Sequence, residues 1–446
     1  MTPTFDQGRD LAWQIMRAAL HAVDPAQAVR HALRRQGDTL SLGERQYDLG
    51  RYRRVLVVGA GKASAPMARA AEEVLGDRLT TGLVDVKYGY TDQTQRIRLR
   101  EAGHPLPDAS GLEGTREIVE LLAGAGEDDL VLCLISGGGS ALMMLPVDGI
   151  TLADYQALTQ VLLRSGATIN HINTIRKHIE RVKGGGLAEV AAPAEVATLI
   201  LSDVIGDPLD FIASGPTVPD TTTYADALDV LQQFDLLGKV PASVVRHLQA
   251  GQRGEVPETP KPGDPLFERV STLVIGSNSI AAEAALAEAR RLGFEALLLS
   301  TYLEGEAREA GKVAAALAKE LVHHQRPLSV PACLILGGET TVTVRGEGKG
   351  GRNQEIALSA AVAIAGLERA LVVALATDGS DGPTDAAGGF ADGHTLERGA
   401  AQGLDARAAL AQNDSYAYLR AVGDLLVTGP TNTNVNDLLF VFAYPA

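Results

Sequence analysis

Apolar segments that end in glycine-rich loops recur along this 446-residue chain. RVLVVGAG ends at Gly61, VLCLISGGG ends at Gly139, and LILGG ends at Gly338. The first of these is followed by a stretch with helical spacing over residues 63–75, and a helix is expected from about Ser140 after the second. Repeated strand–loop–helix units predict a mostly parallel sheet with right-handed crossovers, so the fold class is α/β.

A proline- and glycine-rich stretch divides the chain. Residues 251–265 (GQRGEVPETPKPGDP) contain four prolines, three glycines and five charged residues. This composition is typical of a linker and predicts one domain over 1–250 and a second over 266–446. Two helices are expected within the first 36 residues, ahead of the first strand.

Composition limits the function classes. Hydrophobic residues make up 46% of the chain and aromatic residues only 4%, which suits Val/Leu strands packed on Ala/Leu helices. The formal net charge of −15 argues against a general nucleic-acid or anionic-membrane surface. Cys133 and Cys333 lie in apolar runs and are expected to be core thiols rather than a disulfide. No apolar run reaches about 18 residues, so we expect a cytoplasmic protein.

The loop after the first strand, Gly59-Ala-Gly61-Lys62, resembles two known nucleotide motifs and matches neither. A P-loop needs glycine where Leu56 stands, and a dinucleotide fingerprint needs Gly or Ala where Ser64 stands. Lys62 could be a surface lysine at a tight turn. However, a cation at a helix N-terminus opposes the helix dipole, which favours a bound anion there.

Two further segments favour anion binding. Ser136-Gly-Gly-Gly-Ser140 would let a phosphate approach backbone N–H groups closely. The helix INTIRKHIERVKGGG carries a basic cluster before a second glycine triplet. A solvated helix face with a glycine cap is the alternative, but one glycine would suffice for a cap. The cluster comprises Arg176, Lys177, Arg181 and Lys183.

Acidic residues follow several strands, where α/β proteins bind ligands. Asp203 and Asp207 could orient a hydroxyl, accept its proton or hold Mg²⁺, or they could cap helices. Glu339 follows a strand of the second half, and three acids of ATDGSDGPTDAAG suit Mg²⁺ better than Ca²⁺. Those three acids are Asp378, Asp381 and Asp385. No G-x-S-x-G elbow occurs and no histidine is placed as a base, so hydrolase chemistry is disfavoured.

Taken in order, these segments resemble the type-2 glycerate kinase family, whose C-terminal part is the MOFRL domain. The resemblance covers residues 55–440 approximately and rests on GAGKAS, LISGGGSAL, INTIRKHIERVKGGGLA, LILSDVIGDPLDFIASGPT, LILGGETTVTVRGEGKGGRNQE, ATDGSDGPTDAAG and TGPTNTNVNDL. One departure is Asn432, where the family often has glycine.

The resemblance implies a Rossmann-like N-terminal domain, a MOFRL α/β domain and an active site in the cleft between them. It also implies transfer of the ATP γ-phosphoryl group to glycerate with Mg²⁺, commonly giving 2-phosphoglycerate, with no nucleic-acid or membrane partner. A homo-oligomer is compatible with it. The expected catalytic residues are Lys62, Arg352 and Asp203. The expected nucleotide contacts are Ser136, Gly137, Gly138, Gly139, Ser140, Lys183 and Asn434. Arg176, Asp207 and Glu339 are expected to bind substrate, and Asp378 to bind the metal.

Two other functions remain open at this stage. One is an NAD(P)H-dependent hydroxypyruvate reductase, disfavoured by the imperfect dinucleotide fingerprint. The other is a non-catalytic sensor that binds a nucleotide or sugar acid.

Overall fold

The computed structural model describes residues 4–446 and divides them into two compact units. One, here called the parallel-sheet unit, comprises residues 25–202 and 207–275. The other, the mixed-sheet unit, comprises residues 4–24, 203–206 and 276–446. These boundaries differ from the expected 1–250 and 266–446, because the first helix packs with the C-terminal half. Likewise, residues 251–265 are not a free linker, since Asp220 and Pro260 are joined by a backbone hydrogen bond of 2.9 Å.

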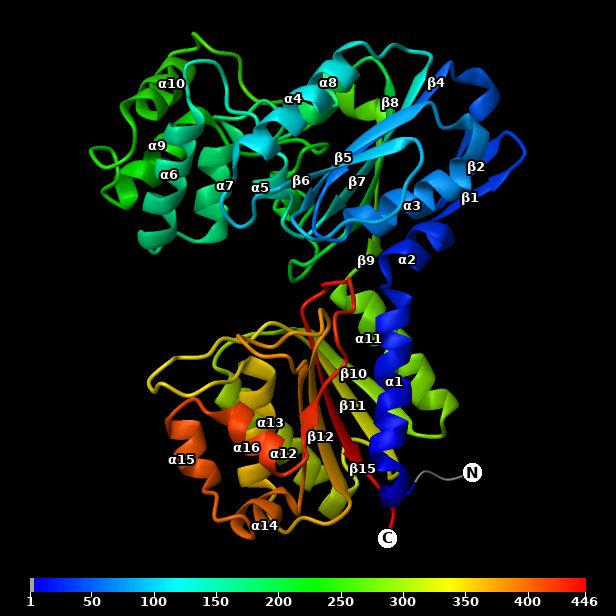
Figure 1. Cartoon of the computed structure of the whole chain (residues 1–446), viewed down its shortest axis with the longest axis vertical. Helices are drawn as coiled ribbons and strands as arrows, with labels where there is room; N and C mark the ends of the chain where they lie inside the picture. The colour runs from blue at the N-terminus through cyan, green and yellow to red at the C-terminus, as the bar shows by residue number, and fades with distance from the viewer. Residues whose placement is uncertain (1–3) are drawn as a thin grey trace. The chain divides into compact units, whose positions relative to one another are not determined.

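The parallel-sheet unit is built on a sheet with strand order β6-β5-β4-β7-β8-β9 (Figure 1). Strands β4, β5, β6, β7 and β8 pair in parallel. Every residue of β7 is buried, as expected for the central strand of a sheet covered on both faces. The strands are β4 (Arg54–Ala60), β5 (Thr81–Lys87), β6 (Ile97–Ala102), β7 (Asp129–Ser136), β8 (Glu195–Leu201) and β9 (Val270–Gly276).

Helices pack on this sheet and also form a lobe beside it. The sheet-packing helices include α3 (Ser64–Leu75) and α4 (Ala109–Ala123), with the shorter α5 (Gly139–Leu142) and α8 (Gly186–Ala191) after the glycine loops. The lobe consists of α6 (Leu152–Arg164), α7 (Ile169–Lys177), α9 (Tyr224–Gln233) and α10 (Ala242–Gln252), which share an apolar core around Tyr155 and Leu231. Helix α2 (Pro25–Ala32) precedes an antiparallel sheet of β1 (Leu33–Gln36), β2 (Thr39–Leu42) and β3 (Arg45–Asp48).

The mixed-sheet unit has strand order β10-β11-β15-β12-β13-β14. Its strands are β10 (Glu295–Leu303), β11 (Ala332–Gly338), β12 (Ala370–Ala376), β13 (Gly388–Asp392), β14 (Leu425–Leu426) and β15 (Asp437–Ala443). Strand β15, the last in the chain, lies between β11 and β12 and runs antiparallel to both.

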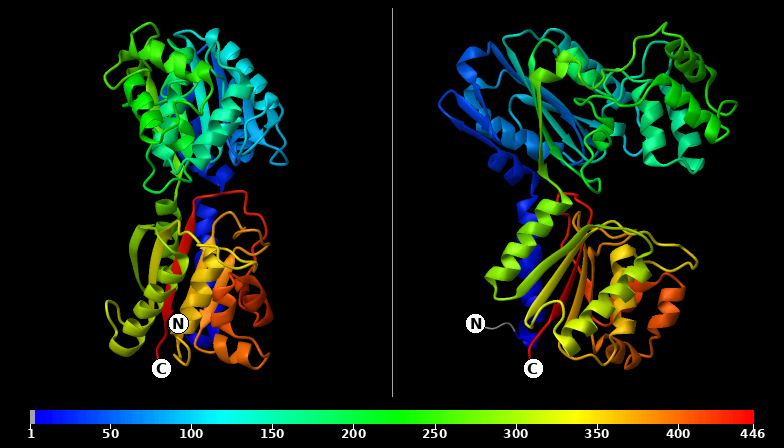
Figure 2. Two further views of the ribbon diagram at one scale, coloured as in Figure 1. Left: turned by 90° about the vertical axis from the view of Figure 1, so that its left-hand side faces the viewer. Right: turned by 180° about the vertical axis from the view of Figure 1, so that it is seen from behind.

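Two layers of helices cover the mixed sheet. Helices α1 (Gly8–Ala22) and α11 (Asn278–Arg291) cover one face, while α12 (Ala307–His324) and α13 (Arg352–Ala363) cover the other (Figure 2). The α12 and α13 layer packs on Leu334, Val372 and Val441. Three shorter helices follow β13, namely α14 (Thr395–Ala400), α15 (Ala406–Ala411) and α16 (Ser415–Ala421).

Most expected elements are present, with two differences. Strand β9 lies in the range expected for the C-terminal domain but joins the first sheet beside β8. The small sheet β1-β2-β3 was not expected. Cys133 and Cys333 are free and buried, as predicted. Over residues 4–446, no helix combines the length and apolar character needed to cross a bilayer.

Candidate active site

Lys62 lies in the turn between β4 and α3 of the parallel-sheet unit. The amide of Gly61 donates to the carbonyl of Asp85 over 3.1 Å, and the amide of Lys62 donates to the carbonyl of Gly137 over 2.9 Å. A Cβ atom on Gly61 would lie 1.9 Å from Ser136 Oγ, so only glycine fits there. The Lys62 side chain is half-buried, and its ammonium has no hydrogen-bond or ion-pair partner in the described part of the chain.

Ser136 joins the two glycine loops of this unit. Its hydroxyl accepts a hydrogen bond from the amide of Ala63 over 3.0 Å and lies 3.0 Å from the hydroxyl of Ser64. The side chain is fully buried. Ser136 was predicted to contact a nucleotide, but its hydroxyl is engaged inside the protein and fixes the position of the loop.

The next three residues of the loop present unpaired backbone amides. Among residues 4–446, the N–H groups of Gly138, Gly139 and Ser140 have no hydrogen-bond acceptor. Gly138 has a φ of +84°, and a Cβ atom on Gly139 would lie 2.9 Å from the Cβ of Ala213. The Ser140 hydroxyl lies 2.9 Å from that of Ser214. Free amides in such a loop can receive an anion.

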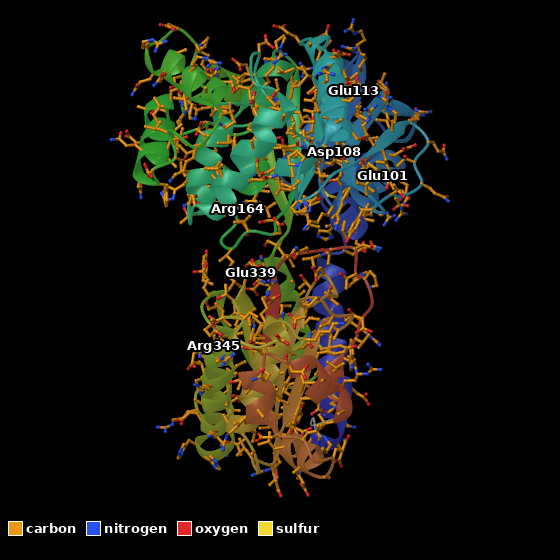
Figure 3. The ribbon with its side chains drawn as sticks, turned by 60° about the vertical axis from the view of Figure 1, so that its left-hand side comes forward. Glu101, Asp108, Glu113, Arg164, Glu339 and Arg345 are labelled. Carbon is orange, nitrogen blue, oxygen red and sulfur yellow. The ribbon has the colours of Figure 1, made fainter. Side chains whose placement is uncertain are left out.

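His104, which the sequence did not single out, also lies at this edge of the sheet. It follows β6, between Glu101 and Asp108, which Figure 3 labels. Burial and the positive charges of Lys62 and Lys87 lower the pKa of His104 to about 4. The imidazole is therefore neutral at physiological pH.

Lys183 is buried and paired. Its ammonium, in a side chain that is 1% exposed, donates to Glu180 Oε2 over 2.8 Å and to the carbonyl of Met143 over 3.0 Å. The hydroxyl of Tyr155 donates to the same carboxylate. Burial lowers the pKa of the Lys183 ammonium, and Glu180 opposes that shift. Lys183, predicted to contact the nucleotide, is thus engaged in a bond between two loops within the protein.

The other predicted basic residues separate into two kinds. Arg176 is half-buried, and its guanidinium has no partner within the residues described; its Nε is enclosed by protein. Arg181 is exposed. Lys177, by contrast, is 2% exposed and lies 3.3 Å from Asp210 and 3.4 Å from Asp220.

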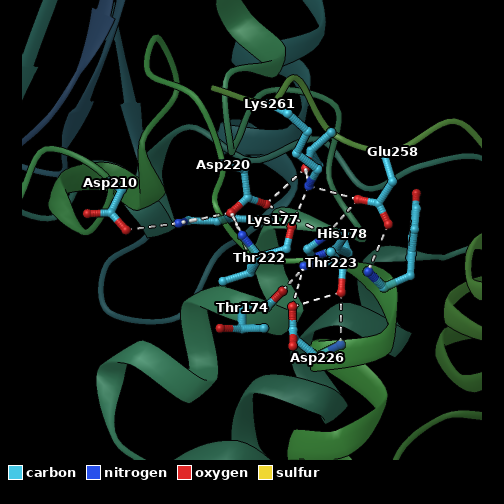
Figure 4. Close-up of polar contacts among 12 residues, drawn as sticks. Thr174, Lys177, His178, Asp210, Asp220, Thr222, Thr223, Asp226, Glu258 and Lys261 are labelled. Carbon is cyan, nitrogen blue, oxygen red and sulfur yellow. Dashed lines mark hydrogen bonds and ion pairs between the residues drawn. The ribbon is translucent and has the colours of Figure 1, made fainter. Parts of the chain in front are cut away.

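Lys177 belongs to a polar network at the base of the helical lobe (Figure 4). His178 Nδ1 donates to the carbonyl of Thr174 over 2.8 Å, and its Nε2 lies 3.4 Å from Glu258. Asp220 accepts hydrogen bonds from the amide and hydroxyl of Thr222. The network ties α7 to the segment expected as a linker.

Arg352 is the centre of a charged cluster in the mixed-sheet unit. Its Nε and Nη2 lie 2.5 and 3.0 Å from the two carboxylate oxygens of Asp437, and Nη1 lies 2.8 Å from Glu339. Asn436 donates from Nδ2 to Glu339 over 2.9 Å and to the carbonyl of Asp203 over 2.9 Å. The structure thus brings together three predicted site residues, and adds Asn436 and Asp437 to them.

Burial acts differently on the two partners of this cluster. It lowers the pKa of the Arg352 guanidinium, but hydrogen bonds to Asp437 and the charges of Asp437 and Glu339 outweigh it and raise that pKa, so Arg352 is a permanent cation. Burial raises the pKa of the Asp437 carboxyl to about 7, against the opposing effect of Arg352.

The remaining predicted residues are Asn434, Asp378 and Asp207. Asn434 Oδ1 accepts from the amide of Asn436 over 3.2 Å. Asp378 is exposed, and its Oδ1 accepts from the amide of Ser380 over 2.9 Å. Asp207 belongs to the parallel-sheet unit and has a φ of +54°. In the chain from residue 4 onward, no group of three or more His, Cys, Asp or Glu side chains could hold a metal ion.

Packing explains why the loop before α13 contains Gly351. Asp381 accepts hydrogen bonds from the amides of Asn353 and Gln354 in the first turn of α13, so this acid caps the helix that carries Arg352. A Cβ atom on Gly351 would lie 2.3 Å from the Asp381 side chain. The loop therefore contributes rigidity to the position of Arg352.

Comparisons with known proteins establish the family of this chain. The family model described as "Domain of unknown function (DUF4147)" matches residues 11–249, and that of the MOFRL family matches residues 332–437. The chain is 46% identical over 432 residues to the glycerate 2-kinase of Pyrococcus horikoshii, covering 97% of this chain and 96% of that protein. This chain belongs to the glycerate 2-kinase family.

Two other relatives refine the comparison. The crystal structure of glycerate kinase from Thermotoga maritima has a TM-score of 0.89 and 43% identity, covering 98% of this chain and 100% of the other. A protein from Agrobacterium vitis with the provisional name hydroxypyruvate reductase is 45% identical over 387 residues and covers 86% of each chain. In this member of the glycerate 2-kinase family, Lys62 and Arg352 belong to the two groups of residues described above.

Proposed function

We propose that this chain is a cytoplasmic, ATP-dependent glycerate 2-kinase that phosphorylates the 2-hydroxyl group of D-glycerate. The observation that carries the proposal is the unpaired state of Lys62 and Arg176 in a chain of net charge −15. Both cations are half-buried. In an acidic protein, cations left without a protein partner beside free loop amides suit ligands that are themselves anionic.

Glycerate and ATP supply such anions as a carboxylate and a triphosphate. In this proposal the amides of Gly138, Gly139 and Ser140 contact phosphate oxygens, and Lys62 binds the migrating phosphoryl group or the substrate carboxylate. Arg176 contributes a further charge to substrate binding.

The mixed-sheet unit supplies Arg352 and Asp203. Arg352 is held rigidly by Glu339 and Asp437, so it can neutralise developing charge on the phosphoryl oxygens without reorganising. Asp203 orients the attacking hydroxyl group. Arg352 and Asp203 are therefore expected to be needed for turnover.

The reaction requires little covalent help from the protein. The bond between the γ-phosphorus and its bridging oxygen breaks, the glycerate oxygen forms the new bond to phosphorus, and the hydroxyl proton leaves to a nearby base or water. Positioning and charge neutralisation account for most of the acceleration in such transfers.

Mg²⁺ fits this chain as an ion that arrives with the nucleotide. Mg²⁺ commonly uses one or two carboxylates together with phosphate oxygens and water. The exposed carboxylate of Asp378 offers one such ligand, which agrees with the lack of a three-carboxylate site in the described residues. When bound, the metal would neutralise phosphate charge.

The deciding experiment combines two assays on the purified full chain. We expect ADP release with D-glycerate and MgATP, and phosphorus NMR should identify the product as 2-phosphoglycerate. We expect no oxidation of NADH or NADPH with hydroxypyruvate. Oxidation without ADP release would replace the kinase with the reductase activity named for the Agrobacterium vitis relative, and ligand-induced stabilisation without either reaction would indicate a sensor.

A further inference from the structure

His104 lies against the two groups that the proposed function already uses in the parallel-sheet unit. A Cβ atom placed on Gly138 would lie 2.9 Å from His104 Cδ2, 3.1 Å from His104 Nε2 and 3.3 Å from Lys62 Cε. The imidazole, the lysine stem and the loop backbone therefore meet at one point, where only glycine leaves room.

These three groups come from different strands that end at the same edge. Lys62 follows β4, His104 follows β6 and Gly138 follows β7. Because these strands are parallel, their carboxyl ends lie together, which is the ligand-binding edge of open α/β sheets. The convergence is thus a product of the topology rather than of neighbouring positions in the sequence.

None of the three has a partner inside the protein. Among the residues described, the His104 ring, the Lys62 ammonium and the Gly138 amide form no hydrogen bond. All three residues are half-buried, so their polar groups remain accessible from outside the protein. Three groups of different chemistry that meet at one point with their hydrogen-bonding capacity free suit a ligand with matching groups.

The chemistry of the three groups defines that ligand. Lys62 requires a negative charge. His104 is neutral because burial and the charges of Lys62 and Lys87 disfavour its protonation. A neutral imidazole has one donor and one acceptor nitrogen, so it pairs well with a hydroxyl group, which can accept and donate. The matching ligand is a small hydroxy acid.

We propose that His104 is a specificity-determining residue that hydrogen-bonds to a hydroxyl group of glycerate while Lys62 holds the negative charge of the same molecule. This inference rests on the proposed function and names the group that distinguishes glycerate from other small carboxylates. A site built to bond a hydroxyl rejects analogues without it, because its polar group is then left unpaired.

The test is a cycle between protein variants and ligand analogues. Binding of D-glycerate, lactate and 3-hydroxypropionate to the full chain is measured by calorimetry for wild type, His104→Ala and His104→Gln. Lactate lacks the 3-hydroxyl group and 3-hydroxypropionate lacks the 2-hydroxyl group. His324→Ala, at the exposed end of α12, serves as the matched control.

We expect His104→Ala to weaken glycerate binding about tenfold, the size of one lost hydrogen bond. The substitution should leave unchanged the binding of the analogue that lacks the hydroxyl contacted by His104. The unaffected analogue therefore shows which hydroxyl that is. His104→Gln, which retains a donor and an acceptor, should recover part of the affinity. Thermal unfolding temperatures should match wild type.

Other outcomes would overturn the inference. An equal loss for all three ligands would mean that His104 acts on the carboxylate or on the fold, and no loss would mean that it faces no ligand. Normal ADP release by wild type with unchanged glycerate binding by the His104 variants would refute this role alone. Absence of glycerate binding to wild type would refute the proposed function as well.

Discussion

Lys62 is a half-buried cation that forms no ion pair with any group in the described chain. Replacing it with methionine keeps the length and apolar stem of the side chain but removes the charge. We expect Lys62→Met to lower kcat/KM for glycerate phosphorylation by about 100- to 1000-fold, the usual effect of losing one group that stabilises transition-state charge. Steady-state kinetics with the ADP-release assay measures this.

The matched control for that variant is Lys239→Met. Lys239 lies on the surface, 2.8 Å from Asp235 four residues earlier, and takes no part in either charged cluster. It should retain wild-type kinetics. Lys62→Met activity within twofold of the control would remove Lys62 from the catalytic proposal.

Arg352 should be more sensitive to geometry than to charge. Its planar guanidinium contacts Asp437 through two nitrogens and Glu339 through the third. A lysine keeps the charge but cannot bridge both carboxylates, so Arg352→Lys should lower kcat at least about tenfold with an unchanged fold. Kinetics and circular dichroism are compared with Arg253→Lys, an exposed arginine paired with Glu255. Full activity of Arg352→Lys would show that only the charge matters.

At the scale of residues, the sequence predicted part of each cluster. Arg352 and Glu339 were expected to serve one site, and they lie 2.8 Å apart. Asp437 was not singled out, because nothing in a linear pattern distinguishes an acid that meets Arg352 across 85 residues. His104 was missed since a lone histidine before a proline has no motif, and only strand order brings it to Gly138.

At the scale of elements, the starts of β4 and β7 are joined by a buried carboxylate. Asp129 accepts from Arg54 Nη2 over 2.5 Å and from the amide of Gly126 over 2.8 Å. The Arg54 hydrogen bond, assisted by those from Gly126 and Arg53, lowers the pKa of Asp129 to about 2 against the opposing effect of burial.

This pair predicts how stability depends on pH. Because the pKa of Asp129 is lower in the folded chain than in the unfolded chain, its contribution is fully present above about pH 4. The contribution is lost as the pH falls from 4 towards 2. Asp129→Asn should therefore lose stability at pH 7 but show a smaller further loss down to pH 3, measured by urea unfolding. If the free energy of unfolding falls equally with decreasing pH in the variant and the wild type, this carboxylate is not a source of acid sensitivity.

The sequence predicted strands where the apolar pattern is long, but it did not predict which strands pair with each other. β7 was expected as a strand and is buried throughout. β9 is also an apolar segment, but its pattern carries no information on which sheet it joins. The strands of the small sheet β1-β2-β3 are only four residues each and are mostly polar, so they lack a readable periodicity.

At the scale of the whole molecule, the two units are discontinuous in sequence. Helix α1 belongs to the mixed-sheet unit, where Ile15 and Met16 are fully buried. Burial of side chains of this size contributes about 1.5–3 kcal/mol each. The boundary expected from the proline-rich stretch would therefore cut away one helical cover of that sheet.

We expect a fragment of residues 266–446 to be poorly folded and prone to aggregation. A second fragment that joins residues 4–24 to 276–446 through a flexible linker should fold cooperatively. Thermal unfolding and size-exclusion chromatography of the two fragments test this. Equal stability of both would show that α1 is dispensable and that the boundary taken from the sequence was adequate.

The central place of β15 has a consequence for synthesis on the ribosome. The mixed sheet cannot close until residues 437–443 emerge, because β15 separates β11 from β12. The parallel sheet, complete once β9 is made, can form earlier. Helix α1 can be covered next, because its main partner α11 follows β9 directly. A chain stalled before residue 437 would thus display a finished first sheet and unpaired edges of β11 and β12, the kind of surface that chaperones bind.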